Sequence, residues 1–73
     1  SQNYNLSKMK KIFEKSLSIN KNLKKGSIIS FNDLECKKPS EMGVLASEFE
    51  LILGKKLVRD KKNHDFLRYE DLE

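Results

Sequence analysis

Apolar and polar residues alternate in short stretches along this chain, which predicts short strands joined by polar turns. In "SLSIN", Leu17 and Ile19 alternate with serine and asparagine, the pattern of a half-buried strand. In the polar stretch that follows, only Leu23 is apolar and is expected to point inward. Gly26 suits a chain reversal because glycine tolerates positive φ. The pattern therefore predicts a mostly β fold with short helical turns.

A return strand and a closing turn complete this first unit. Ile28 and Ile29 are β-branched and predict a strand that re-enters the core, and Ser30 is expected to cap the helical turn in "SFNDL". The same order recurs later, since "KKGSIISFNDL" over residues 24–34 is echoed by "KKNHDFLRYEDL" over residues 61–72. The copies correspond at three positions: Phe31 with Tyr69, Asp33 with Asp71, and Leu34 with Leu72.

The second copy is expected to repeat the whole unit. In its turn an asparagine and a histidine replace the glycine, and Asn63 is expected to adopt the left-handed geometry. Two copies are too few for an open solenoid, which needs about three repeats. The duplication therefore predicts one compact core with pseudo-twofold internal symmetry. The strands expected in this copy are Leu57 with Val58 and Phe66 with Leu67.

Between the copies, the sequence predicts a corner followed by a helix. Pro39 fixes its own φ and favours an extended residue before it, so a rigid corner is expected there. Ser47 and Glu50 have the spacing of a capping box, and Gly54 can end the helix. Such a helix has about two turns and needs packing of its apolar face to be stable. The residues expected on that face are Phe49, Ile52 and Leu53.

Length and charge limit the organisation and the partners. A chain of 73 residues has room for one small domain, which we place at residues 15–73, with residues 1–14 as a linker or N-terminal extension. The alternative for the extension is a helix with Leu6, Met9 and Phe13 on one face. No apolar run approaches the roughly 20 residues that cross a bilayer. The net charge of +4 raises nucleic acid as a partner, but the lysine clusters lack interleaved arginine and aromatic residues, so neither nucleic acid nor membrane is expected.

Candidate chemistry within the chain is sparse. Cys36 is the single cysteine and is expected to be a small buried thiol, and His64 is expected to be a surface histidine in a charged turn. Arg59 and Asp60 are expected to fix a turn or to pair at the surface. No catalytic residue, metal site or cofactor site is predicted, so the isolated chain is expected to be non-catalytic. The carboxylates considered and set aside are Asp33, Glu35, Glu48 and Glu50.

One stretch carries a resemblance to a known family. "SLSINKNLKKGSIISFNDLECKKPSEMGVLASEFELILGKKLVRD", followed by "YEDL", resembles the antifreeze-like, or SAF, domain at the C-terminus of sialic acid synthases and of relatives that make other nonulosonic acids. The likeness covers about residues 15–72. It depends on several elements in order: the "SL" strand entry, the "LKKG" turn, "ND" plus leucine, a basic pair before proline, a "G…EF" helix, and "GKK" followed by "RD".

The resemblance implies a fold and a role. The family's domain has the β-clip fold with internal pseudo-twofold symmetry. In the full enzymes, which are cytoplasmic, a barrel that is absent here condenses phosphoenolpyruvate with N-acetylmannosamine or a related amino sugar, using a divalent metal (Mn or Mg). The SAF domain of one subunit covers the barrel of its partner in a domain-swapped homodimer. This chain is thus expected to be the substrate-site lid of such a transferase.

The resemblance also points to one substrate-binding residue. The family's contact is an arginine in a basic-Arg-Pro-Gly stretch, and Lys38 holds the matching position in "KKPS". Lysine replaces arginine and serine replaces glycine, so the bidentate contact of a guanidinium is not available. The alternative for Lys38 is an exposed lysine beside a structural proline. Its neighbour Lys37 is expected to face solvent.

Two other functions are open to a domain of this kind. Type III antifreeze proteins are similar to it, but ice binding asks for a flat uncharged patch, and the first turn carries Lys21, Lys24 and Lys25. SAF domains also occur in sugar-acid dehydratases and in pilus or flagellar assembly chaperones, where they bind carbohydrate or peptide. The "EFELILGKK" segment and the following "RD" favour the synthases.

Overall fold

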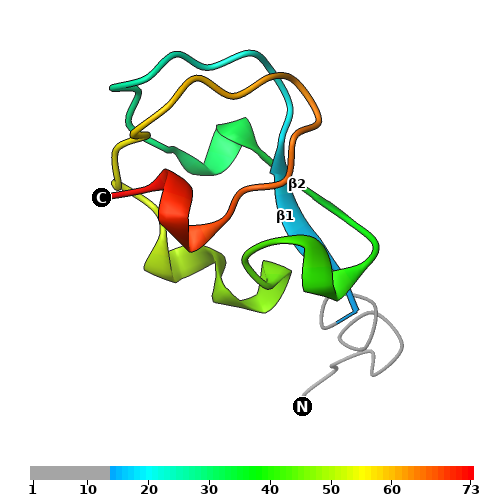
Figure 1. Cartoon of the computed structure of the whole chain (residues 1–73). Helices are drawn as coiled ribbons and strands as arrows, with labels where there is room; N and C mark the ends of the chain where they lie inside the picture. The colour runs from blue at the N-terminus through cyan, green and yellow to red at the C-terminus, as the bar shows by residue number, and fades with distance from the viewer. Residues whose placement is uncertain (1–13) are drawn as a thin grey trace.

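The computed structural model of the chain describes residues 14–73 (Figure 1). The linker or helix considered for the N-terminal extension lies outside the described residues, apart from Glu14. Strand β1 (Ser16–Ile19) pairs with β2 (Leu34–Lys37) in a two-stranded antiparallel sheet. Leu17 lies opposite Cys36, so the strand predicted from "SLSIN" is confirmed.

Strand β1 is bonded along both of its edges. The edge away from β2 bonds to two later segments: the Leu67 amide of the second copy donates to the Leu17 carbonyl at 2.9 Å, and the Leu17 amide donates to the carbonyl of Val44, between the copies, at 2.8 Å. Both faces are also covered, and Ser16 and Ser18 are completely buried. The expectation of a half-buried strand is therefore wrong, because alternation cannot show that a later segment covers the polar face.

The two polar turns lie side by side, as Figure 1 shows for the cyan and the yellow-to-orange parts of the trace. They are joined by isolated antiparallel bridges between Leu23 and Lys61 and between Ile28 and Lys56. The predicted return strand of the first copy is therefore an isolated β-bridge and not a continuous β-strand. Ile29 enters the core as predicted, whereas Ile28 is half exposed.

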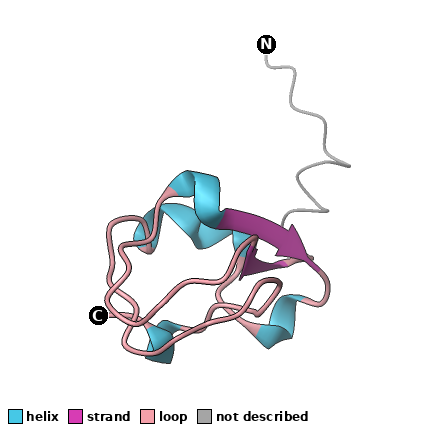
Figure 2. Ribbon diagram, turned by 90° about the horizontal axis from the view of Figure 1, so that it is seen from above, coloured by secondary structure: helices cyan, strands magenta, loops and turns pink. Residues whose placement is uncertain are grey.

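Four short 3-10 helices complete the fold (Figure 2), so the described chain is mostly non-helical. They are η1 (Phe31–Asp33), η2 (Ser40–Met42), η3 (Ala46–Leu51) and η4 (Tyr69–Asp71). The predicted helix with a Ser47–Glu50 capping box is wrong. Its place is taken by η3, which begins after Leu45, has no side-chain cap and is interrupted at Glu48.

Tertiary bonds explain why η3 does not form the predicted helix. The Ala46 amide donates to the Lys15 carbonyl at 3.0 Å, which ties the start of η3 to the chain entering β1. Of the expected apolar face, Ile52 is fully buried and Phe49 is partly buried, but Leu53 is exposed. Packing against the sheet thus overrides a helix of marginal length.

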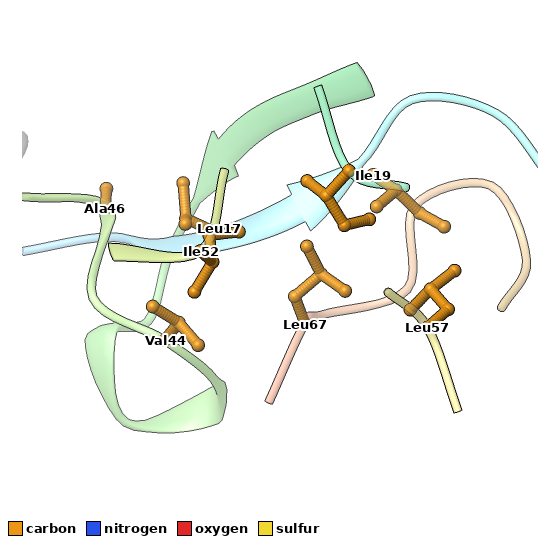
Figure 3. Close-up of a cluster of buried hydrophobic side chains, with 8 residues drawn as sticks. Leu17, Ile19, Val44, Ala46, Ile52, Leu57 and Leu67 are labelled. Carbon is orange, nitrogen blue, oxygen red and sulfur yellow. The ribbon is translucent and has the colours of Figure 1, made fainter. Parts of the chain in front are cut away.

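The core is a single cluster of aliphatic side chains between the sheet and the second copy (Figure 3). Leu23 packs against this cluster from the first turn, which confirms that it points inward. Its buried members are Leu17, Ile19, Ile29, Val44, Ala46, Ile52, Leu57 and Leu67.

The sequence repeat is present in the closing turns. In η1 the Ser30 amide donates to the Asp33 carboxylate at 3.0 Å, and in η4 the Arg68 amide donates to the Asp71 carboxylate at 2.9 Å. The expected capping position of Ser30 is confirmed. Its hydroxyl, however, also hydrogen-bonds Asp33, at 3.0 Å, so the aspartate carries most of the cap.

The chain reversals also correspond, with one correction. The Ser27 amide donates to the Lys24 carbonyl and the Asp65 amide to the Lys62 carbonyl, which places Gly26 and His64 at the third position of equivalent β-turns. Gly26 has φ 93° and His64 has φ 75°. The left-handed residue of the second copy is therefore His64 rather than Asn63, which lies one position earlier in the turn.

Candidate functional site

Lys38 is exposed at the corner where β2 ends. A hydrogen bond from strand β1 holds this corner: the hydroxyl of buried Ser16 donates to the carbonyl oxygen of Pro39 at 2.6 Å. The Lys38–Pro39 peptide bond is cis. A corner bonded to the central strand holds the backbone of Lys38 while its ammonium group stays in solvent.

The neighbouring lysine behaves differently. Lys37 is half buried, and its ammonium nitrogen lies 4.7 Å from the centroid of the Phe66 ring, a cation–π contact. The expectation that Lys37 faces solvent is therefore wrong. Alternation along β2 places Lys37 and Glu35 on the face covered by the second copy, where Glu35 Oε1 lies 3.5 Å from His64 Nδ1. Lys37 thus gives the corner a second brace.

The opposite face of β2 borders an open apolar groove of about 320 Å³. Leu34 and Cys36 form one side, and the rings of Phe31 and Phe49 meet edge to face with centroids 5.6 Å apart. Cys36 is exposed, so the expectation of a buried thiol is wrong. Cys36 lies opposite Leu17 in the sheet, but this face of β2 opens outward, which the residues around Cys36 do not indicate. The lining residues are Leu17, Phe31, Leu34, Cys36, Ala46, Ser47 and Phe49.

A buried carboxylate anchors the second closing turn. The Asp71 side chain is only 2% exposed and pairs with Lys61 Nζ at 2.9 Å and Arg59 Nη1 at 3.3 Å. Asp60 Oδ1 accepts a 2.7 Å hydrogen bond from the Lys25 amide, which ties the two turns together. The expectation that Arg59 and Asp60 fix a turn is confirmed. Arg59 and Lys61 both pair with Asp71, so we interpret their positive charges as structural rather than as part of an anion-binding site.

In the first copy, one lysine supports the corresponding carboxylate. Asp33 Oδ1 lies 3.2 Å from Lys21 Nζ, whose side chain is half exposed. Burial alone would raise the pKa of Asp33. The Ser30 amide and hydroxyl and the Lys21 ammonium outweigh burial and hold the pKa below its ordinary value of 3.8. Asp33 is therefore a structural anion at neutral pH.

A tyrosine links the second closing turn to η3. The Tyr69 hydroxyl donates to Glu48 Oε1 at 2.9 Å. Burial, together with the hydrogen bond and the charge of Glu48, raises the pKa of Tyr69 above 10.0. Tyr69 thus keeps its proton at neutral pH and acts as a hydrogen-bond donor.

Among residues 14–73, the ionisable groups outside these pairs do not gather into a cluster that could bind a metal ion: no three His, Cys, Asp or Glu side chains form such a group. His64 is exposed as expected, with Glu35 as its neighbour. In the same described range, no helix is long and apolar enough to cross a membrane.

These features define a class of protein: a small, mostly non-helical domain of short strands and 3-10 turns that presents a braced lysine corner and an apolar groove. The chain belongs to the SAF domain family, whose model matches residues 14–73, all of the chain that the structure describes. A search of curated proteins found no match. The resemblance drawn from the sequence is therefore confirmed for the SAF domain itself.

Proposed function

We propose that this SAF domain is the substrate-site lid of an N-acylneuraminate (sialic acid-type) synthase. The parent enzyme would condense phosphoenolpyruvate with N-acetylmannosamine or a related amino sugar in a barrel that holds the divalent metal (Mn or Mg). The lid would cover the barrel of the partner subunit in a domain-swapped homodimer in the cytoplasm. The observation that carries the proposal is the SAF match over residues 14–73, together with the ordered motifs that resemble those of the synthases.

Lys38 is the residue we assign to the substrate. It is exposed, while Ser16 and Lys37 brace the backbone on either side of it. An ammonium group at a fixed corner can donate a hydrogen bond to the carbonyl oxygen of an N-acyl group. It cannot form the planar double contact of arginine. A lid of this kind would contribute recognition and exclusion of water, and the barrel would supply the chemistry.

The proposal includes the fold type of the family. A β-clip with pseudo-twofold symmetry is supported by the equivalent closing turns η1 and η4 and by the equivalent reversals at Gly26 and His64.

The test is steady-state condensation of phosphoenolpyruvate with a panel of N-acylated amino sugars, using the full-length parent protein. Lys38→Ala should lower kcat/KM for the preferred sugar by a factor that corresponds to about 1–3 kcal/mol, and Lys38→Arg should retain more activity. Lys62→Ala, an exposed lysine in the second turn, is the matched control. A panel without turnover, or a silent Lys38→Ala variant, would contradict the proposal.

A second candidate is a carbohydrate- or peptide-binding SAF module of another enzyme or of an assembly chaperone. The open apolar groove beside β2 favours it, since a peptide side chain or a sugar face can enter a groove of this kind. Chemical-shift changes at Phe31 and Phe49 on titration with N-acyl sugars or with apolar peptides would identify it. Ice binding stays disfavoured, because Lys21, Lys24 and Lys25 are all exposed.

A further inference from the structure

Strand β2 has one bonded edge and one open edge. The amide and carbonyl groups of Leu17 bond Val44 and Leu67 on the far side of β1, so Leu17 and Cys36 form a non-hydrogen-bonded pair of the sheet. The amide and carbonyl groups of Cys36 therefore point away from β1. Within residues 14–73 they have no backbone partner, because β2 pairs with β1 alone. The outer edge of β2 can thus accept a further strand.

The apolar groove lies beside this open edge. Leu34 and Cys36, whose side chains line the groove, belong to β2 itself, and Phe31 next to them is 63% exposed. A strand added to β2 would place alternate side chains on this same face of the sheet. An open strand edge beside exposed apolar side chains favours a partner that adds a strand and covers them.

The charges of β2 indicate which partner fits. Glu35 and Lys37 stand on either side of Cys36. When two β2 strands pair antiparallel with Cys36 opposite the partner's Cys36, Glu35 lies opposite the partner's Lys37, and the twofold axis repeats this pair. A shift of that axis by one residue would set glutamate opposite glutamate or lysine opposite lysine, which is destabilising. The strand is therefore complementary to itself, in this register.

We propose that two molecules of this chain pair through the open edges of β2, antiparallel and about a twofold axis at Cys36. Each Cys36 amide donates to the carbonyl of the partner's Cys36, so two two-stranded sheets join into one of four strands. Pro39 has no amide hydrogen, which keeps the pairing short. Strand β2 ends at Lys37, so Lys38 stays outside the contact. The contact joins two SAF domains and does not depend on the proposed function.

Cys36, the only cysteine of the chain, reports the register. Opposite residues of a hydrogen-bonded antiparallel pair have Cα atoms about 5.5 Å apart, a separation that a disulfide spans. The experiment treats the 73-residue chain with diamide, an oxidant that takes up the two hydrogen atoms the thiols lose. Wild type should form a covalent dimer. The matched control, Cys36→Ser/Ser47→Cys, moves the thiol to another exposed position on the groove and should cross-link about tenfold more slowly.

Charge reversal tests the pairing without oxidation. Sedimentation equilibrium of the reduced chain should show a reversible monomer–dimer equilibrium. Glu35→Lys sets lysine opposite lysine in both symmetry-related pairs and should raise the dimer Kd about tenfold, as should Lys37→Glu in the opposite sense of charge. The double variant Glu35→Lys/Lys37→Glu should recover the dimer. Lys62→Glu, the same change at an exposed lysine of the second turn, should leave the Kd unchanged.

Several results would overturn the proposal. A chain that stays monomeric at every concentration would leave the edge of β2 to a different protein. A double variant as weak as the single ones, or an equal effect of Lys62→Glu, would show that the Glu35–Lys37 pairs do not form. Equal cross-linking from positions 36 and 47 would show random collision rather than the register. The cross-linking comparison decides the matter if a charge reversal unfolds the chain.

Discussion

The two closing turns share their backbone bonds but differ in how their aspartates are held. Asp33 in η1 pairs with one half-exposed lysine, Lys21, whereas Asp71 in η4 is almost inaccessible and pairs with both Arg59 and Lys61. The two copies therefore share the backbone geometry of the turn but not the ion pairs of its aspartate. The second copy carries the buried charge cluster, and the first copy is the more solvated half.

The two closing turns also differ in the contacts of their first residue. Phe31 and Tyr69 occupy equivalent positions and both contact η3. Phe31 does so with its ring against Phe49, and Tyr69 with its hydroxyl on Glu48. One half thus contributes an apolar wall to the groove, and the other contributes a polar tie. The groove is therefore bordered by the closing turn of the first copy and not by that of the second, although the two turns have the same backbone bonds.

The largest expected effect comes from removing the buried charge. Asp71→Asn leaves Lys61 and Arg59 without their carboxylate and should lower the free energy of unfolding by about 3 kcal/mol. Asp33→Asn, the matched change in the solvated half, should cost about 1 kcal/mol. Urea unfolding followed by circular dichroism measures both. Equal losses would show that the two halves are anchored alike.

A smaller effect separates the two chain reversals. Gly26→Ala should cost about 1 kcal/mol because φ is 93° there, although no atom lies within 4 Å of the added methyl group. His64→Gly should instead stabilise the chain by about 0.5 kcal/mol, since it relieves a left-handed non-glycine residue. Paired urea midpoints check the opposite signs. A loss of stability in His64→Gly would mean that the contact with Glu35 outweighs the strain.

The pH dependence of stability tests the contribution of Asp33, in the first copy. The pKa of Asp33 is lowered in the folded state, so ionised Asp33 stabilises the fold above about pH 4, and this contribution is lost as the pH falls through the folded pKa. Asp33→Asn should therefore lose less stability than wild type between pH 5 and pH 2.5, roughly the window set by a carboxylate of lowered pKa. Urea midpoints over this range measure it, and parallel curves would contradict it.

The smallest effect concerns the polar tie to η3. Tyr69→Phe removes the hydroxyl of a half-exposed residue and should cost about 0.5 kcal/mol or less. The same substitution should remove the absorbance change of the tyrosine of raised pKa from an alkaline titration. A cost well above 1 kcal/mol would indicate that η3 depends on this bond more than on the buried side chain of Ile52.

Local signals in the sequence predicted several elements of the fold. Strand β1, the inward Leu23, the positive φ at Gly26 and the aspartates of the closing turns depend on residues close together in the chain. The errors share another cause. The burial of Ser18 and of Lys37, the exposure of Cys36 and the start of η3 at Ala46 all depend on which distant segment covers a face, and periodicity carries no such information.

The candidate site shows the same division. The assignment of Lys38 depends on the family resemblance at the basic pair before proline, and its contact with a substrate stays a prediction; the structure shows that Lys38 is exposed. The Ser16–Pro39 hydrogen bond and the Lys37–Phe66 contact join residues that are 23 and 29 positions apart, so no local sequence signal predicts them. The groove could not be predicted because its walls come from three separate stretches, represented by Leu17, Phe31 and Phe49.

The last residues of the chain are structural members of the fold. Lys56 and Glu73 exchange two backbone hydrogen bonds of 3.0 and 2.9 Å, and Leu72 lies opposite Leu57. Because the backbone bonding of the fold extends to residue 73, the core can close only after that residue has left the ribosome. A variant that lacks residues 72 and 73 would lose the backbone partners of Lys56 and Leu57, and with them this edge of the fold.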